Sequence, residues 1–260
     1  MLTYPNINPV ALQIGPVAIR WYSLAYIAGI VGGWFYIKKL NALTKVLSAK
    51  AYDEILTWGI LGIILGGRLG YVMFYNPMHF LREPAEIFML WQGGMSFHGG
   101  LLGTIISMLV FCQKYKIKYL QLMDMCAVVA PMGLFFGRIA NFINGELYGN
   151  VTTSPLGMVF PTGGALPRHP SQLYEATLEG LVTFAIINIA FWKFGKWKYK
   201  GYLSGLFLLL YGIFRAFIEL FRQPDAQIGY IEGLVTMGQI LCIPMVVAGI
   251  YLICKSLRKV

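Results

Sequence analysis

Long apolar runs, separated by short polar connections, dominate the chain. Within a run the apolar residues are continuous and do not alternate with polar ones, a pattern that favours helices over the strands of a membrane barrel. A helix needs about 20 mostly apolar residues to cross the hydrocarbon core of a bilayer. Seven stretches have roughly this character: residues 17–37, 55–74, 95–111, 120–139, 173–191, 202–221 and 234–253. The pattern therefore predicts an all-α fold, a polytopic membrane bundle of seven transmembrane helices.

The composition agrees with a membrane protein. Of the 260 residues, 57% are hydrophobic and 12% are charged, whereas soluble globular proteins have about 25% charged residues. The 30 glycines fit as well, because glycine is more frequent in transmembrane helices than in soluble ones. These values exclude a disordered chain, a disulfide scaffold and an ordinary soluble domain. We expect a single integral membrane domain over residues 1–260.

The positive charges predict the orientation of the chain in the membrane. All lysines lie in the connections after the first, third and fifth apolar stretches or in the C-terminal tail. The opposite side carries only Arg20, Arg82, Arg168 and Arg222. Because lysine and arginine accumulate on the cytoplasmic side, we expect the N-terminus outside and the C-terminus in the cytoplasm. The basic clusters do not form one face, so the net charge of +10 does not indicate a nucleic-acid partner.

Two connections on the predicted outer side are longer than simple turns. Residues 76–94 contain two prolines and an apolar stretch at 87–91, which suits a segment lying at the membrane interface. Residues 144–170 contain four prolines and several glycines. We expect them to form a structured outer loop within the membrane domain and not a separate domain.

Polar side chains inside the predicted spans converge on one depth. Such groups are costly in a membrane and usually face the interior of a bundle. Only Asp124 lies near an inner end. The outer set comprises Tyr22, Tyr26, Arg68, His98, Arg138, Asn141, Tyr174, Glu175, Glu179, Arg215, Glu219 and Arg222. Its four arginines exceed its three glutamates, so we expect one excess positive charge there before His98 and Glu146, just past the fourth stretch, are considered.

Two interpretations of these charges remain open. Arg215, Glu219 and Arg222 fall on one helical stripe, and opposite charges that pair would only hold the bundle together. In the second interpretation, Arg138 and Arg215 bind a phosphate or carboxylate, which a guanidinium contacts in a two-pronged geometry. His98 is flanked by glycines that leave room for a ligand. The histidine and cysteine spacings complete no metal site, so we expect neither a metal nor a cofactor.

Several motifs resemble the signatures of one family, the bacterial prolipoprotein diacylglyceryl transferases. They are the sequences GRIANFINGE at 137–146, the glycine-flanked histidine segment at 93–103, RHPSQLYE at 168–175, YGIFR at 211–215 and FRQPD at 221–225. The resemblance covers essentially the whole chain. Each motif alone is moderately specific, and together they are highly specific.

The resemblance implies a reaction and its partners. A diacylglyceryl group moves from phosphatidylglycerol to the thiol of the lipobox cysteine, which follows the signal peptide of a prolipoprotein. A thioether forms and glycerol phosphate is released, in the first step of lipoprotein maturation. The expected location is the bacterial cytoplasmic (inner) membrane, with the active site toward the outer face. A polar zone in the outer half of the bundle fits this demand, because cations stabilise an anionic leaving group.

The resemblance also carries over site residues. The expected catalytic residues are His98, Arg138, Arg215 and Tyr22. The expected substrate-binding residues are Arg138, Asn141, Glu146, Gly149, Arg215, Glu219 and Arg222. We expect Arg138 and Arg215 to bind the head group and stabilise the leaving phosphate, with Asn141 and Glu146 orienting it. Either His98 acts as the base for the thiol, or a nearby arginine stabilises the thiolate.

Two other functions are compatible with buried charges. An ion-coupled transporter would use the arginines and glutamates as a pathway, although the charges stop in the outer half of the bundle. A lipid-binding or scaffold protein would bind anionic head groups without turnover.

Overall fold

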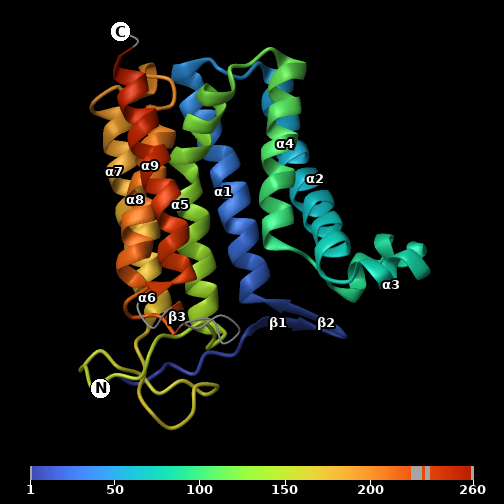
Figure 1. Cartoon of the computed structure of the whole chain (residues 1–260), viewed down its shortest axis with the longest axis vertical. Helices are drawn as coiled ribbons and strands as arrows, with labels where there is room; N and C mark the ends of the chain where they lie inside the picture. Colours follow the sequence, from blue (N-terminus) through green and yellow to red (C-terminus); the bar gives the residue numbers. More distant parts are fainter. Residues whose placement is uncertain (1, 224–229, 232–234, 259–260) are drawn as a thin grey trace. The chain divides into compact units, whose positions relative to one another are not determined.

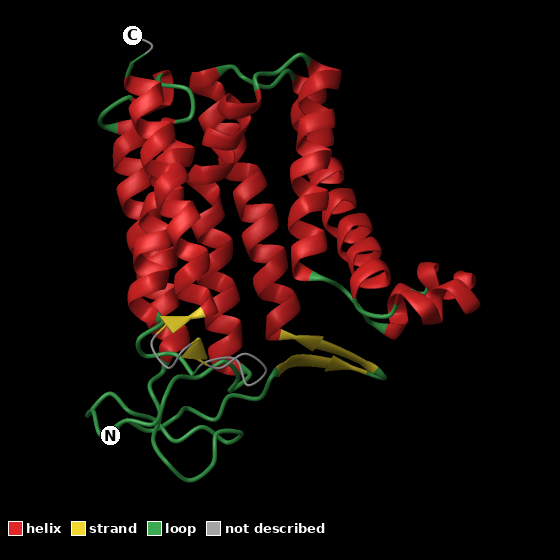
Figure 2. Cartoon of the chain, in the orientation of Figure 1, coloured by secondary structure: helices red, strands yellow, loops and turns green. Residues whose placement is uncertain are grey.

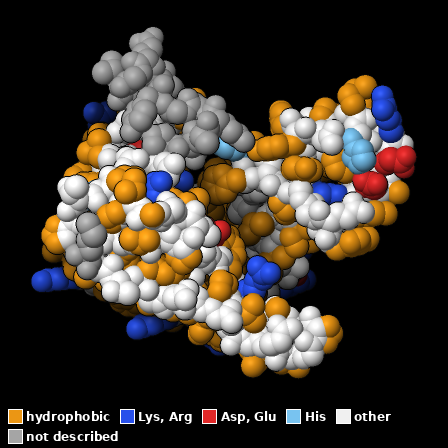
Figure 3. Space-filling view, turned by 90° about the horizontal axis from the view of Figure 1, so that it is seen from below, with side chains coloured by type: hydrophobic (Ala, Val, Ile, Leu, Met, Phe, Trp, Pro, Cys, Tyr) orange, Lys and Arg blue, Asp and Glu red, His pale blue; other side chains and the backbone are white. Residues whose placement is uncertain are grey.

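The computed structural model describes residues 2–223, 230–231 and 235–258. The chain divides into two compact units, which are described separately. The first unit comprises Met1–Leu40 and Met123–Val260, and the second comprises Asn41–Leu122. Most described residues are helical (Figure 2). Seen from below, the surface is mainly hydrophobic or uncharged, and charged side chains are sparse (Figure 3).

The first unit is a bundle of long helices that run side by side (Figure 1). Its helices are α1 (Trp21–Thr44, to Leu40 in this unit), α5 (Tyr119–Ile143, from Met123), α6 (Ser171–Glu175), η3 (Ala176–Val182), α7 (Thr183–Trp192), η4 (Lys196–Lys198), α8 (Tyr202–Ile218) and α9 (Met237–Leu257). The segments α6, η3 and α7 follow one another directly as one helical stretch of 22 residues. Two pairs of antiparallel strands precede helices: β1 (Val10–Ile14) with β2 (Val17–Arg20), and β3 (Tyr230–Ile231) with β4 (Val235–Thr236).

Asp124, which lies in α5, links this helix to the start of α8. Its buried carboxylate accepts hydrogen bonds from the backbone of Gly201 (2.6 Å) and from the backbone and hydroxyl of Ser204 (2.8 and 2.7 Å). These N–H groups belong to the first turn of α8, which otherwise has no side-chain cap. Asp124 therefore caps the N-terminus of α8 from a neighbouring helix.

The second unit pairs α2 (Ala49–Phe74) with α4 (Phe97–Tyr115). A Cβ atom on Gly66 would lie 2.6 Å from the Cα of Gly103, so only glycine permits this approach. Close packing through small residues is a common way for apolar helices to associate. Along the chain, α2 and α4 are connected by α3 (Pro77–Arg82) and the short 3₁₀ helices η1 (Pro84–Phe88) and η2 (Leu90–Gln92).

Arg68 holds this connection to α2. Its guanidinium donates hydrogen bonds to the carbonyl oxygens of Ile87 (2.8 Å), Gly93 (2.5 Å) and Gly94 (3.1 Å), and further bonds to Glu86 and Met89. Only 5% of the residue is exposed. Its donors are therefore already engaged by backbone oxygens of its own unit, so Arg68 stabilises the fold of residues 76–94.

The predicted helical membrane protein is confirmed. Four helices of the described chain are long and apolar enough to cross a membrane: Ala49–Phe74, Tyr119–Ile143, Ser171–Trp192 and Met237–Leu257, and Tyr202–Ile218 is a shorter apolar helix. The expected start of the first helix at residue 17 is wrong. Val17–Arg20 form strand β2, because Gly15 adopts a left-handed conformation (φ +56°) that turns the chain back on β1. The helix starts at Trp21.

Candidate active site

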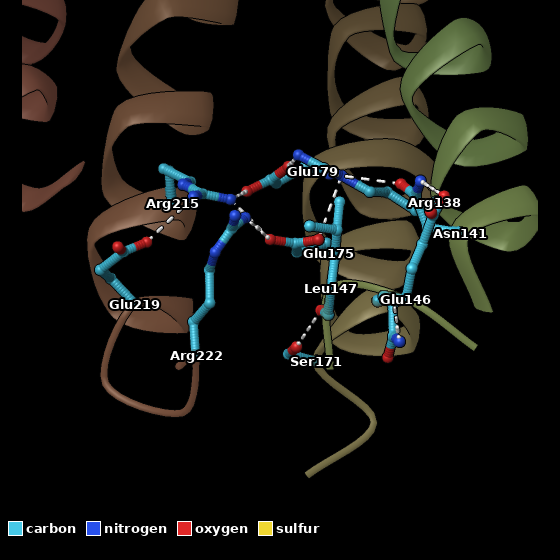
Figure 4. A network of polar contacts seen from close by, with 11 residues as sticks. Arg138, Asn141, Glu146, Leu147, Ser171, Glu175, Glu179, Arg215, Glu219 and Arg222 are labelled. Atoms are coloured by element: carbon cyan, nitrogen blue, oxygen red, sulfur yellow. Dashed lines mark hydrogen bonds and ion pairs between the residues drawn. The ribbon is translucent and has the colours of Figure 1, made fainter. Parts of the chain in front are cut away.

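A buried cluster of arginines and glutamates joins three elements of the first unit (Figure 4). Arg138 comes from α5, Glu175 and Glu179 come from the helix 171–192, and Arg215 and Glu219 come from α8 and its C-terminal cap. Arg222 follows one turn later. These residues, which are expected at one depth from the sequence, lie in contact.

Glu175 is the centre of this cluster. Its Oε2 lies 3.1 Å from Nε of Arg138, and its Oε1 accepts hydrogen bonds from Arg215 (2.5 Å) and Arg222 (3.0 Å). Glu175 has no exposed surface, whereas the arginine side chains are 14–18% exposed. One carboxylate therefore positions three guanidinium groups.

Glu219 and Glu179 make fewer close contacts with the arginines than Glu175 does. Glu219 contacts the second terminal nitrogen of Arg215 at 3.0 Å. Glu179 lies 3.7 Å from Arg138 and 3.8 Å from Arg215, with no exposed surface. Figure 4 shows Glu179 directed toward both arginines.

The local backbone explains how both glutamates reach the arginines. Residues Ala176–Val182 form a π-helix, a rare element that often occurs at functional sites. A Cβ on Gly180 would lie 2.7 Å from the Cβ of Phe135, so the glycine lets this helix approach α5, which carries Arg138. On the other side, a Cβ on Gly238 would lie 2.6 Å from Oε1 of Glu219. Glycines thus allow the charged residues to be enclosed.

Asn141 and Glu146 form a polar layer beside Arg138. The amide of Asn141 donates to Oε1 of Glu146 (2.9 Å), and Arg138 contacts the amide oxygen of Asn141 at 3.5 Å. The side chain of Gln172 donates to the carbonyl oxygen of Glu146 (2.6 Å), and Ser171 donates to that of Leu147 (3.0 Å). The turn after α5 is therefore fixed to the helix that carries Glu175.

Gly149 anchors the chain that carries Arg222. Its N–H donates to the carbonyl oxygen of His169 (2.8 Å), and the next N–H, of Asn150, donates to Phe221 (2.9 Å). A Cβ on Gly149 would lie 2.9 Å from the Cβ of His169, so no larger residue fits here without displacement. Gly149 contributes packing and backbone hydrogen bonds. Burial lowers the pKa of the neighbouring His169.

Comparisons with known proteins show the family of the chain. Residues 9–255 match the family model of prolipoprotein diacylglyceryl transferase. The chain belongs to this family. A protein of Rickettsia felis is 53% identical over 259 residues, and one of Rickettsia rickettsii (strain Sheila Smith) is 54% identical over 259 residues. Both alignments cover 99% of this chain and 100% of the relative.

These relatives bear an enzyme's name. Both are called phosphatidylglycerol–prolipoprotein diacylglyceryl transferase, as is a protein of Rickettsia bellii that is 51% identical over 263 residues. The family resemblance expected from the motifs is therefore confirmed. Nothing in these matches favours a transporter.

The structure brings most predicted site residues of this family member together. Arg138, Asn141, Glu146, Arg215, Glu219 and Arg222 form one network with Glu175 (Figure 4). Tyr22 lies in the same unit on α1, and its hydroxyl is 3.3 Å from that of Tyr26, which interacts electrostatically with Arg138 and Glu146. His98 lies in the second unit, in the first turn of α4 with its ring against Phe97.

The charge of the cluster differs from the excess of one positive charge expected from the sequence. Among the described residues it contains three arginines, Arg138, Arg215 and Arg222, and three glutamates, Glu175, Glu179 and Glu219. Arg68 belongs to the second unit, where backbone oxygens engage it. These six ion-paired residues are therefore formally neutral together, and Glu146, which joins them through Asn141, carries a further negative charge. In the described part of the chain, no group of three histidine, cysteine or acidic residues is placed to hold a metal ion.

Sequence reasoning did not include Glu175 among the site residues. The available signal was the spacing of four residues between Glu175 and Glu179 in an otherwise apolar helix. The same spacing, however, also suits glutamates that only pair with arginines for stability. The number of guanidinium groups that converge on Glu175 distinguishes it, and this number requires the tertiary structure.

We predict that Glu175→Gln destabilises the protein by about 3–5 kcal/mol, because it leaves buried guanidinium groups uncompensated. Unfolding of the purified protein in detergent measures the change. Glu54→Gln is the matched control, since Glu54 forms its ion pair with Lys114 at a partly exposed site and the substitution should change stability little. Equal stability of the two variants would contradict the central role of Glu175.

Proposed function

We propose that this chain transfers the diacylglyceryl group of phosphatidylglycerol to the lipobox cysteine of prolipoproteins. The observation that carries the proposal is the largely buried placement of Arg138 and Arg215 on opposite sides of one carboxylate. Two guanidinium groups held in this way suit the phosphate of an anionic lipid head group. The names of the relatives, which share more than half of their residues with this chain, support the same reaction.

The chemistry demands stabilisation of negative charge. The thiol sulfur attacks the glyceryl carbon of the lipid, a carbon–sulfur bond forms, and the carbon–oxygen bond to phosphate breaks. The electron pair of that bond stays on the phosphate oxygen, and the thiol proton passes to a base. Arg138 and Arg215 stabilise the charge that develops on the phosphate, because fixed charges in a site with little water cost no reorganisation during the reaction.

The surrounding residues orient the head group. Asn141 and Glu146 lie beside Arg138 and offer amide and carboxylate groups to the glycerol hydroxyls. Glu219 holds one end of the Arg215 guanidinium, and Arg222 adds a third cation next to Glu175. Gly149 keeps the segment that carries Arg222 close to the loop. Tyr22 supplies a hydroxyl from α1, and catalysis relies largely on such positioning.

His98 is the proposed base for the thiol. Its position in the first turn of α4, next to Gly99 and Gly100, leaves its ring exposed. A neutral imidazole accepts the thiol proton as the sulfur attacks. If His98 does not act in this way, an arginine of the cluster stabilises the thiolate instead.

We further propose seven spans in the cytoplasmic (inner) membrane, with the N-terminus outside. Three helices, α1, α4 and α8, join the four long apolar ones. Their 24, 19 and 17 residues correspond to roughly 25–36 Å, close to the thickness of a hydrocarbon core. Residues 1–260 then form one membrane domain. Residues 76–94 and the loop 144–170 lie on the outer side, where a secreted substrate is available to the active site.

A transfer assay with purified protein tests the function. Phosphatidylglycerol labelled in its acyl chains should pass its label to a peptide that carries a lipobox cysteine, and a cysteine-to-serine peptide should stay unlabelled. Arg138→Lys and Arg215→Lys keep the charge but lose the planar fork, so we predict a loss of activity of about 100-fold or more. Arg82→Lys is the control, since Arg82 lies in the second unit outside the cluster. Full activity of both cluster variants would refute the assignment of the arginines.

The role of His98 has its own test. His98→Gln should lose most activity at neutral pH while phosphatidylglycerol binding stays intact. Higher pH should partly restore its rate, because more of the substrate thiol is then already ionised. The measurement is the rate as a function of pH for both proteins at saturating lipid. Lost lipid binding, or a near-normal rate at neutral pH, would show that His98 is not the base.

Cysteine labelling tests the topology. In a variant without its natural cysteines, a single cysteine placed between Asn150 and Leu166 should react with a membrane-impermeant reagent added outside intact cells. A cysteine between Lys196 and Lys200 should react only after the membrane is opened, because these residues belong to a cytoplasmic connection. Equal labelling of both positions from outside would refute the proposed orientation.

A further inference from the structure

Glu179 is the carboxylate of the cluster that the proposed reaction does not use. It has no exposed surface, and among the described residues neither of its oxygens has a hydrogen-bond partner. Its guanidinium contacts, 3.7 Å to Arg138 and 3.8 Å to Arg215, are the longest ion pairs of the cluster. Glu175 and Glu219 contact the same arginines at 2.5–3.1 Å. Glu179 is therefore the glutamate whose negative charge is compensated least.

The cluster has no spare positive charge for an anionic ligand. Its three arginines and three glutamates balance among the described residues. The phosphodiester of phosphatidylglycerol adds one negative charge to this buried site. An uncompensated charge in such surroundings is costly. Neutralising one carboxylate with a proton removes that cost, and it also frees the guanidinium edges that the carboxylate faced.

We infer that Glu179 takes up one proton from solvent when the anionic phosphate of a lipid head group binds between Arg138 and Arg215. This inference rests on the proposed function. The charged and titratable groups around Glu179 come from every element packed against it: Arg138 of α5, Glu175 of its own helix, Tyr211, Arg215 and Glu219 of α8 and its cap, and Arg222. A protonated Glu179 can donate to an oxygen of the phosphate that displaces it from the arginines.

Proton uptake makes lipid binding depend on pH with a defined sign. Since the complex holds one more proton than the free protein, affinity for phosphatidylglycerol falls as pH rises. The slope approaches tenfold per pH unit, by the reciprocal coupling of the two ligands, ~1.4 kcal/mol for each unit. Glu179→Gln is permanently neutral at this position, so its affinity should lose this dependence.

Calorimetric titration with a short-chain phosphatidylglycerol measures the proton directly. Binding to the detergent-solubilised full chain is recorded in buffers of different ionisation enthalpy, from mildly acidic to mildly alkaline pH. Wild-type protein should take up close to one proton over part of this range, and Glu179→Gln should take up none. Asp124→Asn is the matched control, a buried acid of the same unit outside the cluster, and it should keep the uptake. Loss of uptake in Asp124→Asn would count against the assignment to Glu179.

Infrared difference spectroscopy of the wild-type protein gives a second measurement that needs no variant. Lipid binding should create the C=O stretch of a protonated carboxylic acid, which Glu179→Gln should lack. Binding without this band and without proton uptake would overturn the inference and leave the proposed function intact. Failure of phosphatidylglycerol to bind at any pH would instead overturn the proposed function.

Discussion

Glu175 has no exposed surface, and its two oxygens contact guanidinium groups of Arg138, Arg215 and Arg222. Each of these charges would be costly to bury alone, and each becomes tolerable because the others are present. The ion pairs hold the helix 171–192, which carries Glu175, to α5, to α8 and to the turn that follows α8, because the arginines come from these three elements. The packing of this end of the bundle therefore depends on one carboxylate.

The same interaction explains why the loop after α5 contributes to the site. Gln172 and Ser171 precede Glu175 in its helix and donate to the carbonyl oxygens of Glu146 and Leu147. Gly149, a few residues later, pairs with the strand-like segment at Arg222. The first residues of the loop are thus fixed to residues next to the cluster. In the proposed reaction this brings Glu146 and the arginines to one head group.

The sequence predicted the helical membrane fold and the residues of the polar zone, because apolar length and intramembrane charge are strong signals. It misplaced the start of α1, where Gly15 turns residues 17–20 into a hairpin. It also counted Arg68 with the other arginines, although backbone oxygens of residues 86–94 engage it. Depth along a helix is readable from sequence, whereas the direction of a side chain around the bundle depends on tertiary contacts. For the same reason, the central position of Glu175 could not be predicted.

The central claim is that Arg138 and Arg215 bind the phosphate of the lipid donor. A structure of the protein with bound phosphatidylglycerol tests it most directly. The account predicts the phosphate between these two residues, with its oxygens about 3 Å from both guanidinium groups. A phosphate bound elsewhere, for example at Arg68 or Arg168, with the contacts of Arg138 and Arg215 to Glu175 unchanged, would contradict it.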